Sequence, residues 1–386
     1  MGNWKTCTIG DLGTVVGGAT PSTKKTENYD GGTISWITPK DLAGFSGRFI
    51  SRGERNITEQ GLKSCSTQLM PAHTVLFSSR APIGYIAIAN QEVCTNQGFK
   101  SVVPNADTDY MFLYYLLKYN KDTIENLGSG TTFKEVSGST MRGIEVSVPE
   151  TIEEQRQIAS VLSALDDKIE KNTEVNENLQ EQAQAIYQHL IIENADESWT
   201  PGVLSDIAII TMGQSPKGES YNEDGVGTVF FQGRAEFGFR FPTRRLYTTE
   251  PKRMAQANDA LMSVRAPVGD MNVAYEDCCI GRGLGAIRSK DGHQSFVLYT
   301  LFALREHLNV FNGEGTVFGS INRDALNSMP IDIPPQEIIN QFESIVAPMD
   351  AAIRNNYDEI CRLQALRDSL LPRLMSGELD VSGLNL

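Results

Sequence analysis

The sequence has few cysteines and histidines and no long apolar run, and each shortage excludes a class of protein. Its 386 residues include six cysteines and four histidines. The cysteines show no C-x-x-C spacing, which favours reduced thiols in a cytoplasmic protein over a zinc site or a disulfide framework. No stretch of about 18 apolar residues occurs, so we expect no membrane partner. The first residues lack a basic segment followed by an apolar one, so we expect no secretory signal.

The sequence also lacks every catalytic signature that we searched for. It contains no H-E-x-x-H metal motif, no G-x-S-x-G nucleophile turn and no Walker loop. The [DNS]-P-P-[YF] signature of adenine methyltransferases is absent too, and Ile333-Pro334-Pro335 is its nearest approach. We therefore expect a chain that is not an enzyme alone, with no metal site and no cofactor of its own.

The net charge of -14 is unevenly distributed. Residues 1–150 are neutral, 151–195 carry -6, 196–335 carry -4 and 336–386 carry -4. Ten of the excess negative charges thus lie in two short segments, and the two longer segments are near neutral. A near-neutral domain can present a basic face to phosphate, so the negative total does not exclude a nucleic-acid partner. The length also suits two domains or more.

The chain is internally repeated, with matching blocks in the same order in both halves. The offset between matching blocks is 184 to 195 residues, far above the period of solenoid repeats. Each copy is therefore a globular domain followed by a helix. We predict an α+β fold with two mixed α/β domains (1–150 and 196–335) and two long helices (151–195 and 336–386). The blocks are 8–22 with 203–217, 75–84 with 260–269, 94–99 with 279–284, 128–133 with 313–318, and 165–172 with 349–356.

Both predicted helices carry a heptad seam, in which the steps alternate between 3 and 4 residues. We expect the two seams to pack on each other antiparallel; the alternative is that each helix packs only on its own domain. Arg367 interrupts the second seam, and Pro348 predicts a kink or a delayed start of that helix. The seam positions are Leu162, Leu165, Ile169, Asn172, Leu179, Ile186 and Leu190, then Met349, Ile353, Asn356, Ile360, Leu363, Leu370 and Leu374.

The length of the first seam suggests a use for it. From residue 162 to 190, at about 1.5 Å per residue, it spans roughly 42 Å. One turn of B-DNA is about 34–36 Å long. An antiparallel helix pair of this length can hold two domains about one DNA turn apart, which makes it a candidate ruler. Asn172 and Asn356 stand at equivalent seam positions, where a buried polar residue fixes register or partner choice.

Several loops suit phosphate contacts. Gly-x-x-Pro turns at 18–21 and 213–216 precede Lys24, Lys25 and Lys217. Arg80 and Arg265 each open an Arg-Ala-Pro-x-Gly turn, where the arginine either contacts DNA or caps its own turn. The Gly-rich loops at 128–134 and 313–318 supply Thr131, Lys134 and Thr316. A plain surface turn is the alternative in each case.

The second domain has a basic stretch with interleaved aromatic residues at 230–247. We interpret it as a base- and phosphate-contacting segment. The alternative is a pair of strands with Phe side chains in the core and solvated arginines. Its cations are Arg234, Arg240, Arg244 and Arg245.

With these features in place, the chain resembles a specificity subunit of a type I restriction–modification system. The resemblance rests on the ending Leu371-Pro372-Arg373-Leu374-Met375-Ser376-Gly377-Glu378-Leu379, on Gly128–Phe133 with Ile144–Pro149 and Glu154–Ile158, and on Met212–Pro216 with Gly281–Leu284. It covers essentially the whole chain. Single motifs are weakly specific, whereas their order, repeated twice, is highly specific.

The resemblance implies two target-recognition domains that each read one half of a split site in double-stranded DNA, with Asn96 and Arg282 among the contacting residues. The helices would set the gap and dock two modification subunits, which methylate adenine at N6 with S-adenosylmethionine; restriction and motor subunits, with ATP and Mg, would complete the complex. The acidic helix segments fit a protein-facing role. Two alternatives remain: a scaffold or interaction protein that does not read DNA, and an enzyme with an unrecognised site.

Overall fold

The computed structural model describes residues 3–130, 134–196, 199–313 and 319–381. The chain divides into two compact units: Met1–Thr173 with Asp358–Leu386 forms unit 1, and Glu174–Tyr357 forms unit 2. Both cuts fall inside the long helices, at positions that the sequence repeat makes equivalent. Each unit therefore combines one globular domain with one half of each long helix. In the part of the chain that is described, no helix is both long and apolar enough to cross a membrane.

The domain of unit 1 is built on a five-stranded sheet of order β2-β9-β6-β7-β4, in which only β4 and β7 pair parallel. A three-stranded sheet of order β5-β3-β8 and the antiparallel pair β1-β10 complete it. The strands are β1 (Trp4–Thr8), β2 (Gly13–Gly17), β3 (Ile34–Ile37), β4 (Phe49–Ile50), β5 (Asn56–Ile57), β6 (Val75–Ser79), β7 (Ile83–Ala89), β8 (Cys94–Thr95), β9 (Lys100–Pro104) and β10 (Glu145–Pro149).

The short helices of unit 1 lie between and beside these strands. Helix α3 (Tyr110–Tyr119) has Asp109 as its N-cap, whose side chain accepts a 2.9 Å bond from the Phe112 amide. Six consecutive residues of α3 are buried, as its apolar sequence predicts. The others are α1 (Ile9–Leu12), η1 (Thr26–Asn28), η2 (Pro39–Leu42), α2 (Glu59–Lys63), α4 (Lys121–Asn126) and α5 (Gly138–Arg142).

The domain of unit 2 has a four-stranded sheet of order β12-β20-β17-β18, a five-stranded sheet of order β13-β15-β14-β19-β16 and the pair β11-β21. Its strands are β11 (Thr200–Val203), β12 (Ala208–Met212), β13 (Tyr221–Asn222), β14 (Thr228–Phe231), β15 (Leu246–Thr248), β16 (Met254–Ala255), β17 (Ala260–Ser263), β18 (Met271–Val273), β19 (Cys278–Ile280), β20 (Leu284–Ser289) and β21 (Pro330–Ile333). Its helices are η4 (Gly218–Ser220), η5 (Arg234–Glu236), α7 (Leu204–Ile207), α8 (Gln294–Ala303), α9 (Arg305–Asn309), η6 (Val310–Asn312) and α10 (Arg323–Asn327).

The two domains share one frame. The order β2-β9-β6-β7 in unit 1 matches β12-β20-β17-β18 in unit 2, and the pair β1-β10 matches β11-β21. In both, a strand after the first glycine turn pairs parallel with the strand that carries the repeated cysteine: Trp36 with Cys94 and Phe230 with Cys279. The two predicted Arg-Ala-Pro turns lie between antiparallel strands, β6 and β7 in unit 1 and β17 and β18 in unit 2.

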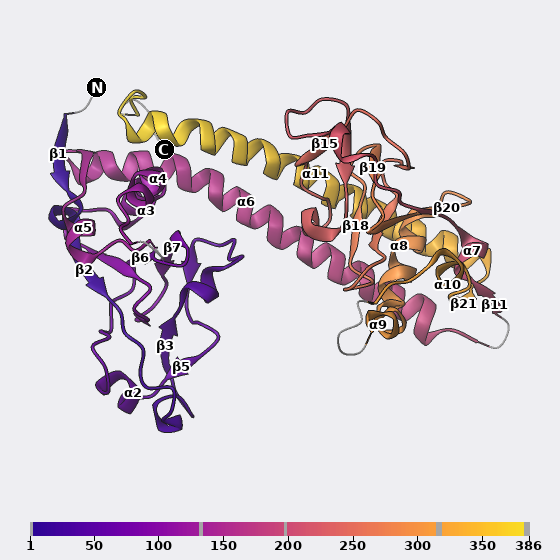
Figure 1. Cartoon of the computed structure of the whole chain (residues 1–386), viewed down its shortest axis with the longest axis horizontal. Coiled ribbons are helices and arrows are strands. Elements are labelled where there is room, and N and C mark those ends of the chain that lie inside the picture. Colours follow the sequence, from indigo (N-terminus) through magenta and orange to yellow (C-terminus); the bar gives the residue numbers. More distant parts are fainter. Residues whose placement is uncertain (1–2, 131–133, 197–198, 314–318, 382–386) are drawn as a thin grey trace. The chain divides into compact units, whose positions relative to one another are not determined.

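The two long helices are α6 (Ile152–Tyr187) and α11 (Gln336–Met375), drawn in magenta and yellow in Figure 1. Within each unit they pair antiparallel. In unit 1, Leu162 shares a core with Leu371 and Leu374, and in unit 2 Ala183 shares one with Val346. Domain side chains belong to the same two clusters, so the helices pack on each other and on the domains at once.

Each predicted seam residue is buried or half-buried. Two expectations for the helices need correction. Leu190 lies beyond α6, in a π-helical turn η3 (Gln188–Glu193). The delayed start expected from Pro348 is wrong, because α11 begins well before it and continues through it.

The polar seam residues form hydrogen bonds between the helices. In unit 1, Asn172 Nδ2 donates to Glu359 Oε2 at 2.7 Å. This hydrogen bond is the largest of the influences that hold the pKa of Glu359 below its ordinary value. In unit 2, Asn356 Nδ2 donates to Asn176 Oδ1 at 2.8 Å. Because the bonds join specific positions, they favour one register of the pair.

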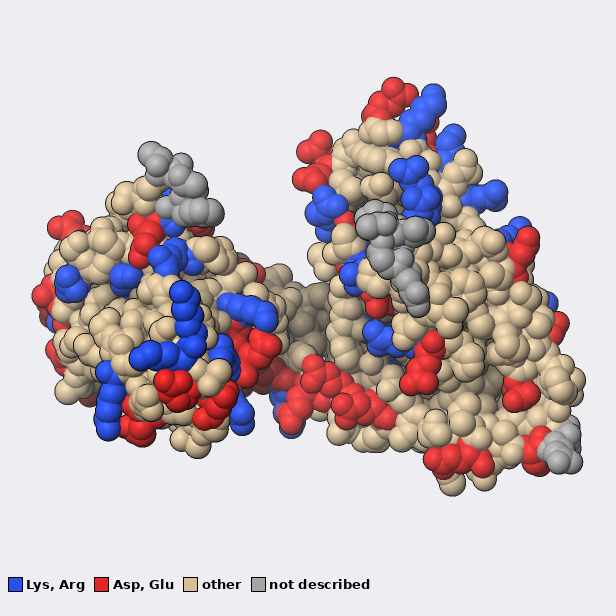
Figure 2. All heavy atoms as spheres, turned by 60° about the horizontal axis from the view of Figure 1, so that its bottom comes forward, with Lys and Arg blue, Asp and Glu red and all other residues tan. Residues whose placement is uncertain are grey.

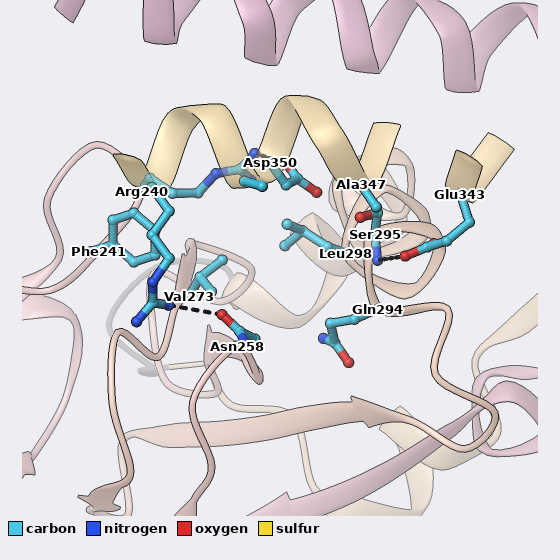
Figure 3. A pocket seen from close by; sticks show the side chains of 12 residues that line it. Arg240, Phe241, Asn258, Val273, Gln294, Ser295, Leu298, Glu343, Ala347 and Asp350 are labelled. Atoms are coloured by element: carbon cyan, nitrogen blue, oxygen red, sulfur yellow. Dashed lines mark hydrogen bonds and ion pairs between the residues drawn. The ribbon is translucent and has the colours of Figure 1, made fainter. Parts of the chain in front are cut away.

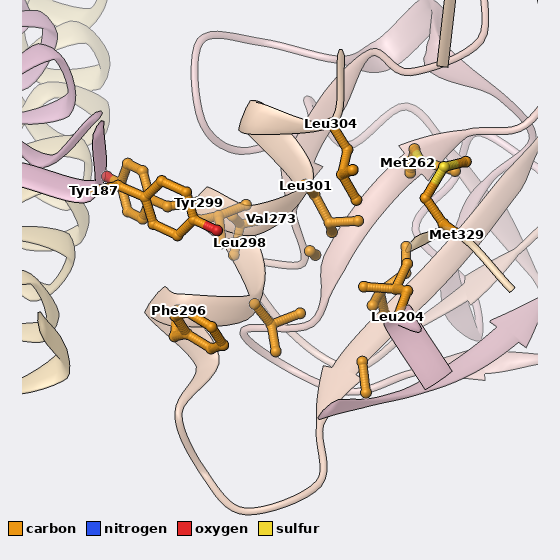
Figure 4. Close-up of a cluster of buried hydrophobic side chains, with 14 of the residues drawn as sticks. Tyr187, Leu204, Met262, Val273, Phe296, Leu298, Tyr299, Leu301, Leu304 and Met329 are labelled. Carbon is orange, nitrogen blue, oxygen red and sulfur yellow. The ribbon is translucent and has the colours of Figure 1, made fainter. Parts of the chain in front are cut away.

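The core of unit 2 lies between α8, the sheet and the helices (Figure 4). Phe296, Tyr299 and Leu301 of α8 are at most 2% exposed and pack against Tyr187 of α6 and against Met262 of β17. Full burial of one such side chain contributes about 1.5–3 kcal/mol. This packing fixes α8 and the sheet of unit 2 against the long helices.

Candidate nucleic-acid interface

The loops that the sequence singles out meet at one place in unit 1. The Ala19 amide donates to Thr95 O at 3.0 Å, which joins the glycine turn to the loop after β8. The Ser79 amide donates to Gly98 O at 2.7 Å, and the Val136 amide donates to Ser79 O at 3.0 Å. Backbone bonds thus connect the glycine turn, the Cys94–Phe99 block, the end of β6 beside Arg80 and the segment after the Gly-rich loop.

Unit 2 repeats this connection at a constant offset of 185 residues. The Val264 amide donates to Gly283 O at 2.9 Å, and the Ile321 amide donates to Val264 O at 3.0 Å. The glycine turn joins the same cluster through the Gln214 amide, which donates to Ile280 O at 3.0 Å. We call these two sets of loops the loop clusters of units 1 and 2. Because backbone atoms hold them together, their side chains can differ without loss of the frame.

Two glycines allow the close approach on which the loop clusters depend. A Cβ atom on Gly18 would lie 2.1 Å from Thr95 O, and a Cβ on Gly213 would lie 2.1 Å from Gly281 O. Real Cβ atoms do not come this close to backbone oxygen, so any other residue would push the two loops apart. The repeated glycine is therefore explained by backbone contact and needs no DNA.

Some predicted DNA-contacting cations are exposed. Lys24, Lys25, Lys134, Arg265 and Arg282 all belong to the exposed class, and no carboxylate among the described residues forms an ion pair with them. Lys217 is also exposed and lies 3.7 Å from Glu219. The other five cations are surrounded by water and counterions, and the counterions are released when a phosphate binds.

Other predicted cations are engaged by carboxylates within their own unit. Arg80 Nη1 lies 3.6 Å from Glu135 Oε2. In unit 2, three further arginines, each about half exposed, have partners of the same kind. The pairs are Arg234 with Asp270 at 2.5 Å, Arg244 with Glu276 at 2.5 Å, and Arg245 with Glu236 at 2.6 Å and Glu223 at 3.3 Å. For DNA to bind these groups it must compete with, or rearrange, existing pairs.

Arg240 requires a correction. Its side chain is 4% exposed, and Nη2 donates to Asp350 Oδ1 of α11 at 2.5 Å and to the Tyr299 hydroxyl at 2.9 Å. Figure 3 shows it among the side chains that line a pocket of about 320 Å³, on the side where Asp350 projects from α11. A buried arginine bound to a helix of its own unit is a structural group, so its assignment as a DNA contact is wrong.

The remaining predicted positions are mixed. Asn96 Oδ1 accepts a 2.8 Å bond from the Gly98 amide and so shapes its loop. Thr131 and Thr316 lie outside the described residues. The sequence reasoning passed over Gln97 and Gln214, which are exposed in the two loop clusters. Gln97 already stood in a repeated block, and glutamine can pair with adenine in the major groove, so the signal was available.

The surface charge is mixed in sign. On the face shown in Figure 2, Lys and Arg side chains gather on both units, interspersed with Asp and Glu rather than forming a field of one sign. No group of three or more His, Cys, Asp or Glu that could hold a metal ion occurs among the described residues.

Comparison with known proteins identifies the family. The model of the type I restriction modification DNA specificity domain matches residues 1–181 and 196–360. The MjaIX specificity subunit of Methanocaldococcus jannaschii is 34% identical over 417 residues, which cover 99% of this chain and 95% of the relative. The EcoR124I/EcoR124II specificity subunit of Escherichia coli is 29% identical over 170 residues, or 42% of this chain and 40% of the relative.

A solved structure supports the fold. The type I restriction–modification S subunit from M. genitalium matches with a TM-score of 0.62 over 97% of this chain and 96% of that chain, at 17% identity. The likeness confirms the predicted fold class of two mixed α/β domains with paired long helices. The chain belongs to the family of type I restriction–modification specificity subunits, which recognise the DNA target and leave the chemistry to other subunits of the complex.

Proposed function

We propose that this chain reads an asymmetric DNA site in two parts, one part with each domain, and directs adenine-N6 methylation and restriction by partner subunits. The observation that carries the proposal is the pair of loop clusters. The backbone bonds made by Ser79 and Val136 recur at an offset of 185 residues, and the glycine turn is bonded in both clusters, while several side chains differ. Asn96 and Gln97 in unit 1 correspond to Gly281 and Arg282 in unit 2, whereas Arg80 and Arg265 are the same.

The difference in side chains argues for two different half-sites. Glutamine and asparagine pair best with adenine, and arginine pairs best with guanine. A duplicated frame that carried the same side chains twice would suit a symmetric target. The exposed lysines beside each cluster supply the sequence-independent phosphate contacts.

The long helices have the second role in this proposal. Their segments carry ten of the fourteen excess negative charges of the chain, which suits a protein partner better than phosphate. We place two modification subunits on them, with the restriction and motor subunits joining the same complex. S-adenosylmethionine, ATP and Mg²⁺ then belong to those partners, and the helices set the gap between the half-sites. The expected cytoplasmic location stays a prediction.

DNA binding by the complex with its modification subunits tests the proposal. We expect a plot of log affinity against log salt with a slope of several units, since each neutralised phosphate contributes about 0.9. Arg265→Ala and Arg282→Ala should change the bases accepted in one half-site and leave the other unchanged. Glu250→Ala, which removes an exposed acidic group of unit 2 outside the loop clusters, serves as the control.

Three results would count against the proposal. Equal damage to both half-sites from the unit 2 variants contradicts the assignment of one domain to one half. Absence of salt-dependent DNA binding supports the scaffold alternative, and methyl transfer by the purified chain alone supports the enzyme alternative.

A further inference from the structure

Unit 1 contains a buried arginine that joins the domain to helix α6. The Arg48 side chain is 5% exposed, although it stands in a loop just before β4. Nε and Nη2 donate to the two oxygens of Glu170 at 3.0 and 2.9 Å, and Nη2 also donates to Asp167. The Arg48 amide donates to Glu170 as well, at 3.1 Å. One helical carboxylate thus receives three bonds from one domain residue.

The main chain of Arg48 is fixed to the sheet at the same time. Its carbonyl accepts a 2.7 Å bond from the Ile88 amide of β7. Arg48 is therefore bonded to β7 through its main chain and to α6 through its guanidinium, so it fixes the sheet relative to the helix. A two-point guanidinium–carboxylate contact fixes direction as well as distance.

Arg240 is the counterpart of Arg48 in unit 2. Its carbonyl accepts a 2.8 Å bond from the Val273 amide, and Val273 stands 185 residues after Ile88. Its guanidinium donates to Asp350 of α11. Both arginines thus link the same point of the domain frame to a carboxylate on a long helix, which is α6 in unit 1 and α11 in unit 2.

Asp350, the partner of Arg240, also belongs to a repeated Tyr–Asp pair, whose member in unit 1 is Asp166 and not a partner of Arg48. Asp166 accepts a 2.7 Å bond from the Tyr115 hydroxyl, and Asp350 accepts one of 3.1 Å from the Tyr299 hydroxyl, with an offset of 184 for both residues. In unit 1 the pair is completed by Arg367 of α11, at 2.7 Å from Asp166. In unit 2 it is completed by Arg240. The same Tyr–Asp pair is thus used differently in the two copies.

We propose that Arg48 and Arg240 are positioning residues that fix the angle at which each recognition domain is carried on its helices, and so restrict the gap between half-sites that the complex accepts. The inference rests on the proposed two-part reading. Neither arginine lies in a loop cluster, and each is too buried to touch DNA. A buried ion pair adds little stability over an apolar contact of the same shape, but its directed bonds exclude other orientations.

Arg48→Met is the sharper test, because Asp167 and Glu170 are 67% and 36% exposed at their side chains and become hydrated when the arginine is removed. The variant is assembled with the modification subunits, and adenine methylation is measured on a DNA library with fixed half-sites and gaps of varied length. We expect the same bases in both half-sites, while the preference for the native gap over one base pair more or less falls by roughly tenfold, since accurate positioning is worth one to two orders of magnitude in rate.

Three further variants complete the experiment. Arg48→Lys keeps the charge but cannot form the forked contact, so it should restore the gap preference only partly. Arg240→Met with Asp350→Leu removes both charges of the unit 2 pair and should give the same relaxation. Arg362→Met removes an exposed arginine of α11 and should leave the preference unchanged.

The outcomes separate this inference from the proposed function. Unchanged gap discrimination in folded, assembled Arg48→Met and in the unit 2 double variant overturns it. Altered base preference in a half-site overturns it too, because the arginine would then act on DNA reading itself. If the wild-type complex accepts every gap equally, the ruler fails and the inference fails with it.

Discussion

Removal of Arg367 should destabilise unit 1 far more than its place in an apolar seam suggests. Asp166 is 6% exposed at its side chain and Arg367 is 16% exposed, so the pair is largely out of water. Loss of one partner from a buried pair costs about 3–5 kcal/mol, because a charge is left unpaired. Asp166 keeps its bond from the Tyr115 hydroxyl, and Arg367 retains some exposure. We therefore expect Arg367→Ala to cost about 2–3 kcal/mol.

Urea unfolding measures this cost. A background in which Trp199 of unit 2 is replaced by Phe restricts tryptophan fluorescence to Trp4 and Trp36 of unit 1, so that the transition of this unit is followed separately. Each unit has its own core, so one transition for the whole chain is not assumed.

Two matched variants define the result. Arg362→Ala removes an exposed cation from the same helix and should change stability by less than about 0.5 kcal/mol. Arg367→Met with Asp166→Leu removes both charges and should recover most of the loss. A cost below about 0.5 kcal/mol for Arg367→Ala would refute the reasoning, since it would mean that Asp166 needs no cation.

Further predictions concern titration, reactivity and geometry. The pKa of Glu359, followed by NMR, should lie below the ordinary range for glutamate, and Asn172→Ala should raise it toward that range. Because the pKa is lowered in the folded state, the stability that Glu359 contributes is present above its ordinary pKa and is lost as the pH falls through the folded-state pKa. An alkylating reagent at pH 8 should modify exposed Cys361 first and spare Cys94 and Cys278, since burial raises the pKa of both to about 12; equal rates in folded protein would contradict their burial. Deletion of one heptad from α6 should change the gap between methylated half-sites, and an unchanged gap would refute the ruler.

The repeat and the helices could be predicted from the sequence because their signals are periodic. A seam that alternates steps of 3 and 4 depends only on which residues are apolar, and blocks that recur in order require no knowledge of contacts.

The individual contacts were harder to predict because sequence patterns do not show direction. Arg240 stands among aromatic residues and exposed arginines, and its neighbours gave no sign that it faces α11. A signal did exist elsewhere. Asp166 and Asp350 occupy the same place in the two copies, and so do Tyr115 and Tyr299. A tyrosine and an aspartate that recur at the same core positions in both copies indicate a buried hydrogen bond between them. The buried aspartate then needs a nearby cation, and in unit 2 that cation is Arg240.

For the loop clusters, the sequence indicated the segments but not the contacts of their residues. The sequence pointed to these loops because glycine, proline and basic residues recur there, and it left open whether they are phosphate contacts or plain surface turns. In the structure, Gly18 and Gly213 are required by backbone contact alone. For the 230–247 stretch the sequence favoured DNA contacts over strands with solvated arginines, and in the structure Arg244 and Arg245 have carboxylate partners. Composition identifies a charged segment but not the charges opposite it.

The most direct test of the whole account is a map of methylated adenines in DNA from cells that express this chain together with modification subunits. We predict methylation in two short, different sequence elements separated by a constant gap, and none when this chain is omitted. Methylation within one uninterrupted motif, or at sites that do not depend on this chain, would contradict the two-part reading.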